Sequence, residues 1–215
     1  TPPLESIKLL LAAAASRRKK VVHLDVKRAY FNAPVLREVF VELDERDRRP
    51  GEEWMVGRLN FAMYGTRDAA SAWEAKYTQV LLSAGFTQGR ASPCIFRRGQ
   101  VLVVVHGDDF TMTGDDDGLK EVEEHMARHF EVKKQVLGPG GSKEIIVLNR
   151  RISMTEAGIL YEPDGKHALR ILKELGLDQE GVKGTVTTGR KLGEEGVRLE
   201  EEKLKDEEAR WYRSL

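Results

Sequence analysis

The stretch VLVVVHGDDFTMTG, residues 101–114, places two adjacent acidic residues between two β-rich runs. Valine favours a buried, pleated strand and Gly-Asp is typical of a tight turn, so the pattern predicts a β-hairpin with Asp108 and Asp109 at its tip. Neighbouring carboxylates repel each other unless they lie in solvent or share a cation. The pair is therefore a candidate Mg²⁺ site, although a solvated turn is the simpler explanation of an isolated Asp-Asp.

A third acidic residue lies inside another apolar run. In VVHLDVKRAYF, residues 21–31, Asp25 follows a buried-strand pattern and directly precedes Val26. A carboxylate in such a strand costs free energy unless it is paired, hydrogen-bonded or bound to metal. Phosphoryl-transfer sites hold Mg²⁺ through protein oxygens together with a bound phosphate. The spacing permits a site shared by Asp25 and the hairpin tip but does not establish it.

Four ordered blocks carry a resemblance to a known family. They are LDVKRAYFNA (24–33), AMYGTRDAASAWEAKYTQVLLSAGFTQGRASPCIF (62–96), VVVHGDDFTMTG (103–114) and FEVKKQVLG (130–138). Together they resemble the reverse transcriptase of copia-type long-terminal-repeat retrotransposons, from about Ser6 to about Leu177. The resemblance implies that Asp25, Asp108 and Asp109 are the catalytic carboxylates.

The resemblance also implies a reaction, a cofactor and partners. It implies an RNA-directed DNA polymerase in which two Mg²⁺ (or Mn²⁺) ions are bridged by Asp25 and Asp108, with Asp109 and the carbonyl of Val26 as supporting ligands. Its partners would be an RNA template, a DNA primer, deoxynucleoside triphosphates and the other domains of a Pol polyprotein. The competing interpretations are a catalytically dead, nucleic-acid-binding remnant of the same fold and a metal-dependent nuclease.

Two residues are candidate nucleotide contacts. Tyr30 lies five residues after Asp25, where the family places an aromatic ring under the incoming sugar, and a ring there would exclude a 2′-hydroxyl. Arg67 is a candidate contact to a phosphate. We expect Phe31 to lie in the core, and Asp68, where the family commonly carries Gln, to cap a helix.

Composition limits the class of protein. The chain has 215 residues, of which 40% are hydrophobic and 33% charged, and no apolar run approaches the ~20 residues that span a bilayer. We therefore expect no membrane partner. Basic and acidic residues number 35 each, so a nucleic-acid path would depend on local basic clusters such as 17–20. The single cysteine, Cys94, suits a reducing compartment, and we expect an intracellular location, cytoplasmic in a particle and also nuclear.

The order of the expected elements is that of an α+β protein. We expect helices at 6–16, 68–84, 117–129 and 165–175, strands at 20–31 and 37–43, and hairpins at 101–113 and 144–162. With the resemblance, this order predicts a right-hand polymerase palm, in which helices pack on one face of an antiparallel sheet, with partial fingers and the start of a thumb.

The expected domain division lies near residue 138. We expect residues 1–137 to form partial fingers and the palm with its catalytic carboxylates. Residues 138–215 would form the palm end, a thumb-like start and an acidic helical tail. The family also carries an upstream fingers segment with basic residues, which nothing here matches, so we expect this 215-residue segment to extend primers poorly by itself.

Overall fold

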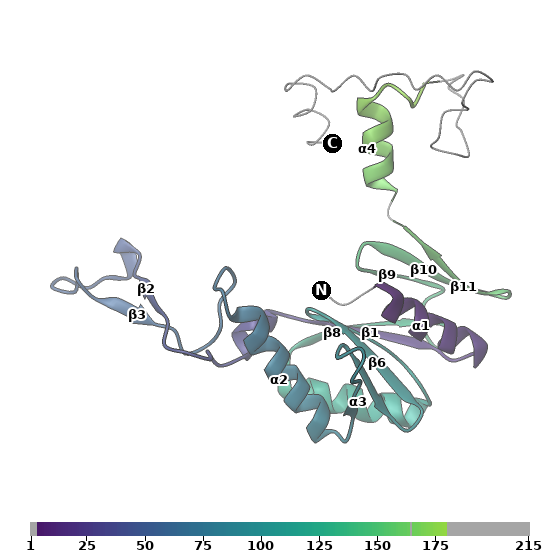
Figure 1. Ribbon diagram of the computed structural model, residues 1–215, viewed down its shortest axis with the longest axis horizontal. Coiled ribbons are helices and arrows are strands. Elements are labelled where there is room, and N and C mark those ends of the chain that lie inside the picture. Colours follow the sequence, from purple (N-terminus) through teal and green to yellow (C-terminus); the bar gives the residue numbers. More distant parts are fainter. Residues whose placement is uncertain (1–3, 164, 180–215) are drawn as a thin grey trace, which may run out of the picture. The chain divides into compact units, whose positions relative to one another are not determined.

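The computed structural model describes residues 4–163 and 165–179. The chain divides into two compact units, residues 1–162 and 163–215. The first unit combines helices with antiparallel sheets, which confirms the predicted α+β class (Figure 1). The two compact units divide after Glu162. The predicted boundary near residue 138 is of another kind, because it separates the palm from the start of the thumb, and it stays a prediction.

A six-stranded antiparallel sheet forms the centre of the first unit. Its strands lie in the order β4-β5-β6-β7-β1-β8. Their bounds are Thr87–Gln88 for β4, Ile95–Arg98 for β5, Val101–His106 for β6, Asp109–Thr113 for β7, Val21–Val26 for β1 and Val132–Leu137 for β8. The predicted hairpin at 101–113 is confirmed as β6 and β7. Gly107 in its turn has φ of 65°, a left-handed conformation that glycine adopts without a steric penalty.

Strand β1 lies between two partners that come from much later in the sequence. It pairs with β7 from Val21 opposite Thr113 to Asp25 opposite Asp109, and with β8 from Val21 opposite Leu137 to Val26 opposite Val132. The predicted strand at 20–31 is too long, because the chain leaves the sheet after Val26. Arg28 then adopts a left-handed conformation and the 3₁₀ helix η1, Ala29–Asn32, follows.

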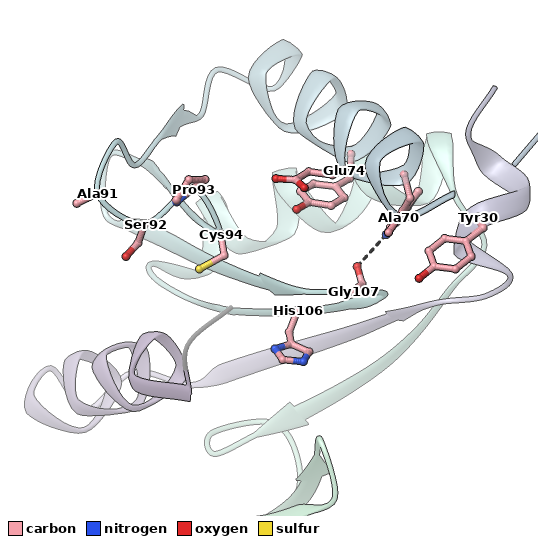
Figure 2. Close-up of a pocket in the computed structure, with 11 residues that line it drawn as sticks. Tyr30, Ala70, Glu74, Ala91, Ser92, Pro93, Cys94, His106 and Gly107 are labelled. Carbon is pink, nitrogen blue, oxygen red and sulfur yellow. Dashed lines mark hydrogen bonds between the residues drawn. The ribbon is translucent and has the colours of Figure 1, made fainter. Parts of the chain in front are cut away.

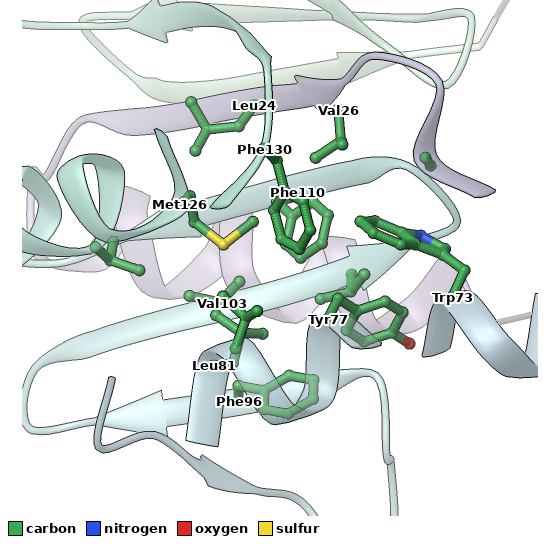
Figure 3. Close-up of a cluster of buried hydrophobic side chains, with 14 of the residues drawn as sticks. Leu24, Val26, Trp73, Tyr77, Leu81, Phe96, Val103, Phe110, Met126 and Phe130 are labelled. Carbon is green, nitrogen blue, oxygen red and sulfur yellow. The ribbon is translucent and has the colours of Figure 1, made fainter. Parts of the chain in front are cut away.

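Helices cover both faces of this sheet. Helices α2 (Ala69–Ser83) and α3 (Asp116–His129) pack on the face that carries the larger hydrophobic cluster, in which Trp73, Tyr77, Phe96, Phe110 and Phe130 meet (Figure 3). Helix α1 (Leu4–Ser16) belongs to a second cluster, which includes strand residues such as Val21 and Val104. The expectation that the helices share one face is therefore wrong for α1. The reason is that successive residues of a strand alternate between faces and the sheet has apolar residues on both, such as Val22 and Leu24 in the larger cluster and Val21 and Val104 in the second.

Two smaller sheets complete the first unit. Strands β2 (Phe40–Glu42) and β3 (Val56–Arg58) form a two-stranded sheet; β2 lies within the strand expected at 37–43, whereas β3 is not among the expected elements. Strands β9 (Glu144–Val147), β10 (Arg150–Thr155) and β11 (Gly158–Glu162) form a three-stranded sheet in place of the expected single hairpin. The additional turn has positive φ at Leu148 and Asn149, and leucine at such a position gives little turn signal.

The helix ends follow the expected chemistry in part. The side chain of Asp115 accepts a hydrogen bond of 2.8 Å from the amide of Gly118 and so caps α3. In the second unit, α4 (Lys166–Glu174) corresponds to the expected helix and Gly176 follows it with φ of 65°. The predicted acidic tail lies outside the described residues.

Across the described helices, none is long and apolar enough to cross a membrane.

Candidate active site

The three acidic residues singled out in the sequence meet at one end of strands β1 and β7. Asp25 lies directly opposite Asp109, and opposed residues of an antiparallel pair project from the same face of a sheet. The amide of Val26 donates a hydrogen bond of 3.0 Å to the carbonyl of Asp108, which joins the β6–β7 turn to the end of β1. The structure therefore brings Asp25, Asp108 and Asp109 into one cluster, which we call the carboxylate cluster.

The surroundings of Asp108 disfavour its charged form. Burial raises the pKa of Asp108, and the negative charges of Asp109 and Asp25 raise it further, while the backbone amide of Asp108 lowers it. Asp108 lies exposed at the turn, whereas Asp25 and Asp109 are half-buried. Carboxylates gathered this closely are typical of a site for a cation.

A buried histidine contacts the cluster from β1. Nε2 of His23 lies 3.1 Å from Oδ1 of Asp109, and Nδ1 lies 3.2 Å from Oγ1 of Thr111. His23 is a residue of the site that no sequence motif singled out. Its position two residues before Asp25 was a usable signal, since residues i and i+2 of a strand share a face.

An open pocket of about 500 Å³ lies beside the β6–β7 turn, between α2 and the segment that precedes β5. Figure 2 shows Tyr30 at one end of it and Ala91 at the other, with Cys94, His106 and Gly107 between them. Indole Nε1 of Trp73 donates a hydrogen bond of 2.8 Å to the carbonyl of Gly107, which fixes the turn to α2 (Figure 2).

The aromatic residues after β1 form a small exposed group. The ring of Tyr30 lies 4.5 Å from that of Tyr64, and Phe31 meets Tyr64 edge-on at 5.6 Å. Burial raises the pKa of Tyr64, as does the negative charge of Asp108, which places this group near the carboxylate cluster. The expectation that Phe31 is a core residue is wrong, since 46% of it is exposed and the turn into η1 directs it outward.

The charged residues before α2 differ from expectation. Arg67 is exposed in the turn before α2, so its contact to a phosphate stays a prediction. Asp68 occupies the N-cap position of α2, but its side chain makes no capping hydrogen bond and instead forms an ion pair with Arg37. The capping role predicted for Asp68 is therefore wrong, because a carboxylate that accepts from a guanidinium gains a charge-assisted bond in place of the amide.

Acidic neighbours partly neutralise two basic residues, Lys20 of the basic cluster 17–20 and Lys134 on β8. Lys20 forms an ion pair of 3.0 Å with Asp116, and Lys134 pairs with Glu123. These pairs lower the local positive charge that could attract a phosphate backbone.

Residues 2–143 match the family described as reverse transcriptase (RNA-dependent DNA polymerase). The chain belongs to this family. The match covers the carboxylate cluster, the Tyr30 region and the six-stranded sheet. It confirms the resemblance to reverse transcriptases of copia-type retrotransposons that the four sequence blocks carry.

Curated relatives of this reverse transcriptase segment come from plant transposons. The Retrovirus-related Pol polyprotein from transposon TNT 1-94 of Nicotiana tabacum is 28% identical over 142 residues, which are 63% of this chain and 10% of that protein. That from transposon RE2 of Arabidopsis thaliana is 30% identical over 141 residues, which are 60% of this chain and 9% of that protein. The chain thus spans about a tenth of the length of these relatives.

Solved structures with a distant similarity include two telomerases. Apo telomerase from Candida tropicalis, truncated from its C-terminal domain, aligns with a TM-score of 0.43 and 10% identity, over 74% of this chain and 39% of that one. Telomerase from Candida albicans, in complex with a fragment of telomeric RNA, aligns with a TM-score of 0.43 and 11% identity, over 80% of this chain and 38% of that one.

The family generally uses divalent metal ions, and the donor set of the cluster is compatible with one. Within the described residues, no group of three or more His, Cys, Asp or Glu side chains is arranged to hold a metal ion by itself. Mg²⁺ in phosphoryl-transfer sites, however, is bound by one or two carboxylates, with phosphate and water supplying its other oxygens. Asp25 and Asp108 could supply the two carboxylates that such a site needs.

We predict that Asp108→Asn stabilises the metal-free protein at pH 7 by a few tenths of a kcal/mol, because it removes a charge that is disfavoured by burial and by repulsion from Asp109 and Asp25. The folded-state pKa of Asp108 is raised, so its ionisation opposes folding as pH rises through that value. The gain should therefore vanish well below the ordinary value of 3.8, where the carboxyl is neutral in both states. Urea denaturation at pH 7 and at a pH well below 3.8 measures the free energy of unfolding, with the exposed Asp117→Asn as control. Destabilisation by Asp108→Asn at pH 7 would contradict the prediction.

Proposed function

We propose that this chain is the catalytic palm of an RNA-directed DNA polymerase from a retrotransposon Pol polyprotein. The observation that carries the proposal is the register of β1 against β7, which sets Asp25 opposite Asp109 beside the turn that holds Asp108. Membership of the reverse transcriptase family supports the same reaction.

The proposed reaction joins the 3′-hydroxyl oxygen of a DNA primer to the α-phosphorus of a deoxynucleoside triphosphate, and pyrophosphate leaves. Asp25 and Asp108 would hold Mg²⁺ or Mn²⁺ ions, with Asp109 and the carbonyl of Val26 in support. Bound ions supply neutralisation of the phosphate charge and activation of the attacking oxygen. Residues of the chain position the reactants, and positioning with electrostatic stabilisation provides most of the catalysis in phosphoryl transfer.

Nucleotide selection would depend on Tyr30. Its ring is half-buried, contacts the ring of Tyr64 and lies beside the pocket at the β6–β7 turn. A rigid ring at the sugar would exclude a 2′-hydroxyl, and Arg67 would contact a phosphate.

The partners of this domain would be an RNA template, a DNA primer and the other domains of the polyprotein, in a cytoplasmic particle and in the nucleus. A second candidate function is a nucleic-acid-binding remnant without turnover. The observations that favour it are the equal number of acidic and basic residues and the ion pairs of Lys20 and Lys134, which weaken attraction to a template.

Asp25→Asn and Asp108→Asn should each lower primer extension on an RNA template by at least about 100-fold. Each removes a ligand and charge that offsets the cation, at a cost of several kcal/mol in the transition state. Extension assays with Mg²⁺ or Mn²⁺, run on the domain within its Pol polyprotein, measure this, alongside Mn²⁺ calorimetry, and Asp117→Asn is the matched control. Extension that survives both substitutions would contradict the polymerase site. An unsubstituted polyprotein that binds the template but never extends a primer would favour the remnant.

Replacing Tyr30 with Val should admit ribonucleotides, because it removes the ring that would meet the 2′-hydroxyl. Incorporation of ribo- and deoxynucleotides is compared in the same extension assay. Tyr30→Phe should keep the discrimination, and Phe31→Val, at an exposed neighbour, is the matched control. If Tyr30→Val discriminates as strongly as the parent, Tyr30 is not the gate. Loss of packing should also lower stability by up to a few kcal/mol.

A further inference from the structure

The buried side of the carboxylate cluster holds an imidazole to which the proposed reaction assigns no role. His23 is 3% exposed, and both of its ring nitrogens have partners on the neighbouring strand β7. Its side chain is more deeply buried than that of Asp109, whose side-chain exposure is 21%. The imidazole of His23 is therefore held beneath Asp109, on the buried side of the cluster.

The partners of the ring define where its protons lie. An ionised carboxylate can only accept hydrogen bonds, so Nε2 carries a proton that it donates to Oδ1 of Asp109. Nδ1 then either accepts the hydroxyl proton of Thr111 or, in the imidazolium form, donates to that oxygen. Both arrangements leave the bond from Nε2 to Asp109 intact.

The position of His23 in the sheet indicates that its hydrogen bond to Asp109 does more than fill space in the core. On the same face of β1, Val21 lies in the hydrophobic cluster with α1, and an apolar residue at position 23 would extend that cluster. Burying an imidazole there costs free energy unless both nitrogens are satisfied. The chain meets this requirement with two hydrogen bonds, and one of them goes to the carboxylate cluster.

We propose that His23 is a positioning residue that restrains Asp109 and makes the acids of the cluster unequal. Its bond occupies Oδ1 of Asp109 and fixes the side-chain rotamer, which leaves one oxygen, Oδ2, for a cation. Asp108, at the exposed turn, is not held in this way. Asp25 and Asp108 are therefore the principal ligands, and Asp109 is a weak one as long as His23 is present.

This inference rests on the proposed function, because it assigns unequal roles toward a divalent cation. Hydrogen-bonded partners of metal ligands orient those ligands and tune a metal site.

The test is a double-mutant cycle between positions 23 and 109 in the full 215-residue chain, read by calorimetry with Mn²⁺ alone. In the parent, Asp109→Asn should weaken Mn²⁺ binding by less than about threefold, because Asp109 is restrained. In the His23→Asn background, the released Asp109 becomes a full ligand, and the same substitution should cost about tenfold. His23→Asn alone should not weaken Mn²⁺ binding.

His23→Gln provides the matched control. A glutamine side chain can place an N–H donor near the position of Nε2, whereas asparagine reaches only the position of Nδ1. Glutamine should therefore restore the small effect of Asp109→Asn seen in the parent. Equal costs of Asp109→Asn in the parent and in His23→Asn would overturn the inference, as would identical behaviour of the Asn and Gln variants.

A metal-free measurement separates failure of this inference from failure of the proposed function. The ¹⁵N NMR spectrum of the metal-free chain should show a proton on Nε2 of His23, and Asp109→Ala should shift that resonance. Absence of the Nε2 proton, or no response to Asp109→Ala, would overturn the His23 role while leaving the polymerase site intact. Unchanged Mn²⁺ affinity in Asp25→Asn and Asp108→Asn, with the NMR result as expected, would instead overturn the metal site.

Discussion

The site depends on the antiparallel register between β1 and β7. Sliding β1 by one residue would turn Asp25 to the opposite face, which carries the largest apolar cluster, and would bury a carboxylate without a partner. The same slip would move His23 away from Asp109. Hydrophobic packing on both faces of β1 therefore selects the one alignment in which the acids meet.

Two hydrogen bonds fix the β6–β7 turn at the end of the aligned strands. The β6–β7 turn is held from one side by Trp73, which donates to the carbonyl of Gly107, and from the other by Val26, which donates to the carbonyl of Asp108. Trp73 also packs against Phe110 and Phe130 in the core. A rigid turn of this kind keeps three negative charges together at a cost in stability, as expected of sites that bind cations.

Local patterns in the sequence predicted the elements well but not their long-range partners. The β6–β7 hairpin and helix α3 follow from residues a few positions apart, so both were predictable. The pairing of β1 with β7 joins residues more than 80 positions apart, and a single sequence suggests it only through the family resemblance. His23 and the ion pair between Asp68 and Arg37 were missed for the same reason, since each partner lies on a distant segment.

The most direct measurement of the central claim, that β1 and β7 together build a cation site, is paramagnetic broadening of a ¹⁵N-labelled chain by Mn²⁺. The amides of Asp25, Val26, Asp108 and Asp109 should broaden first and together, because they flank one site on two strands. Asp115, Asp116 and Asp117, an acidic run at the start of α3, should respond only at higher Mn²⁺. Broadening that begins at that run, or that affects β7 without β1, would contradict the shared site.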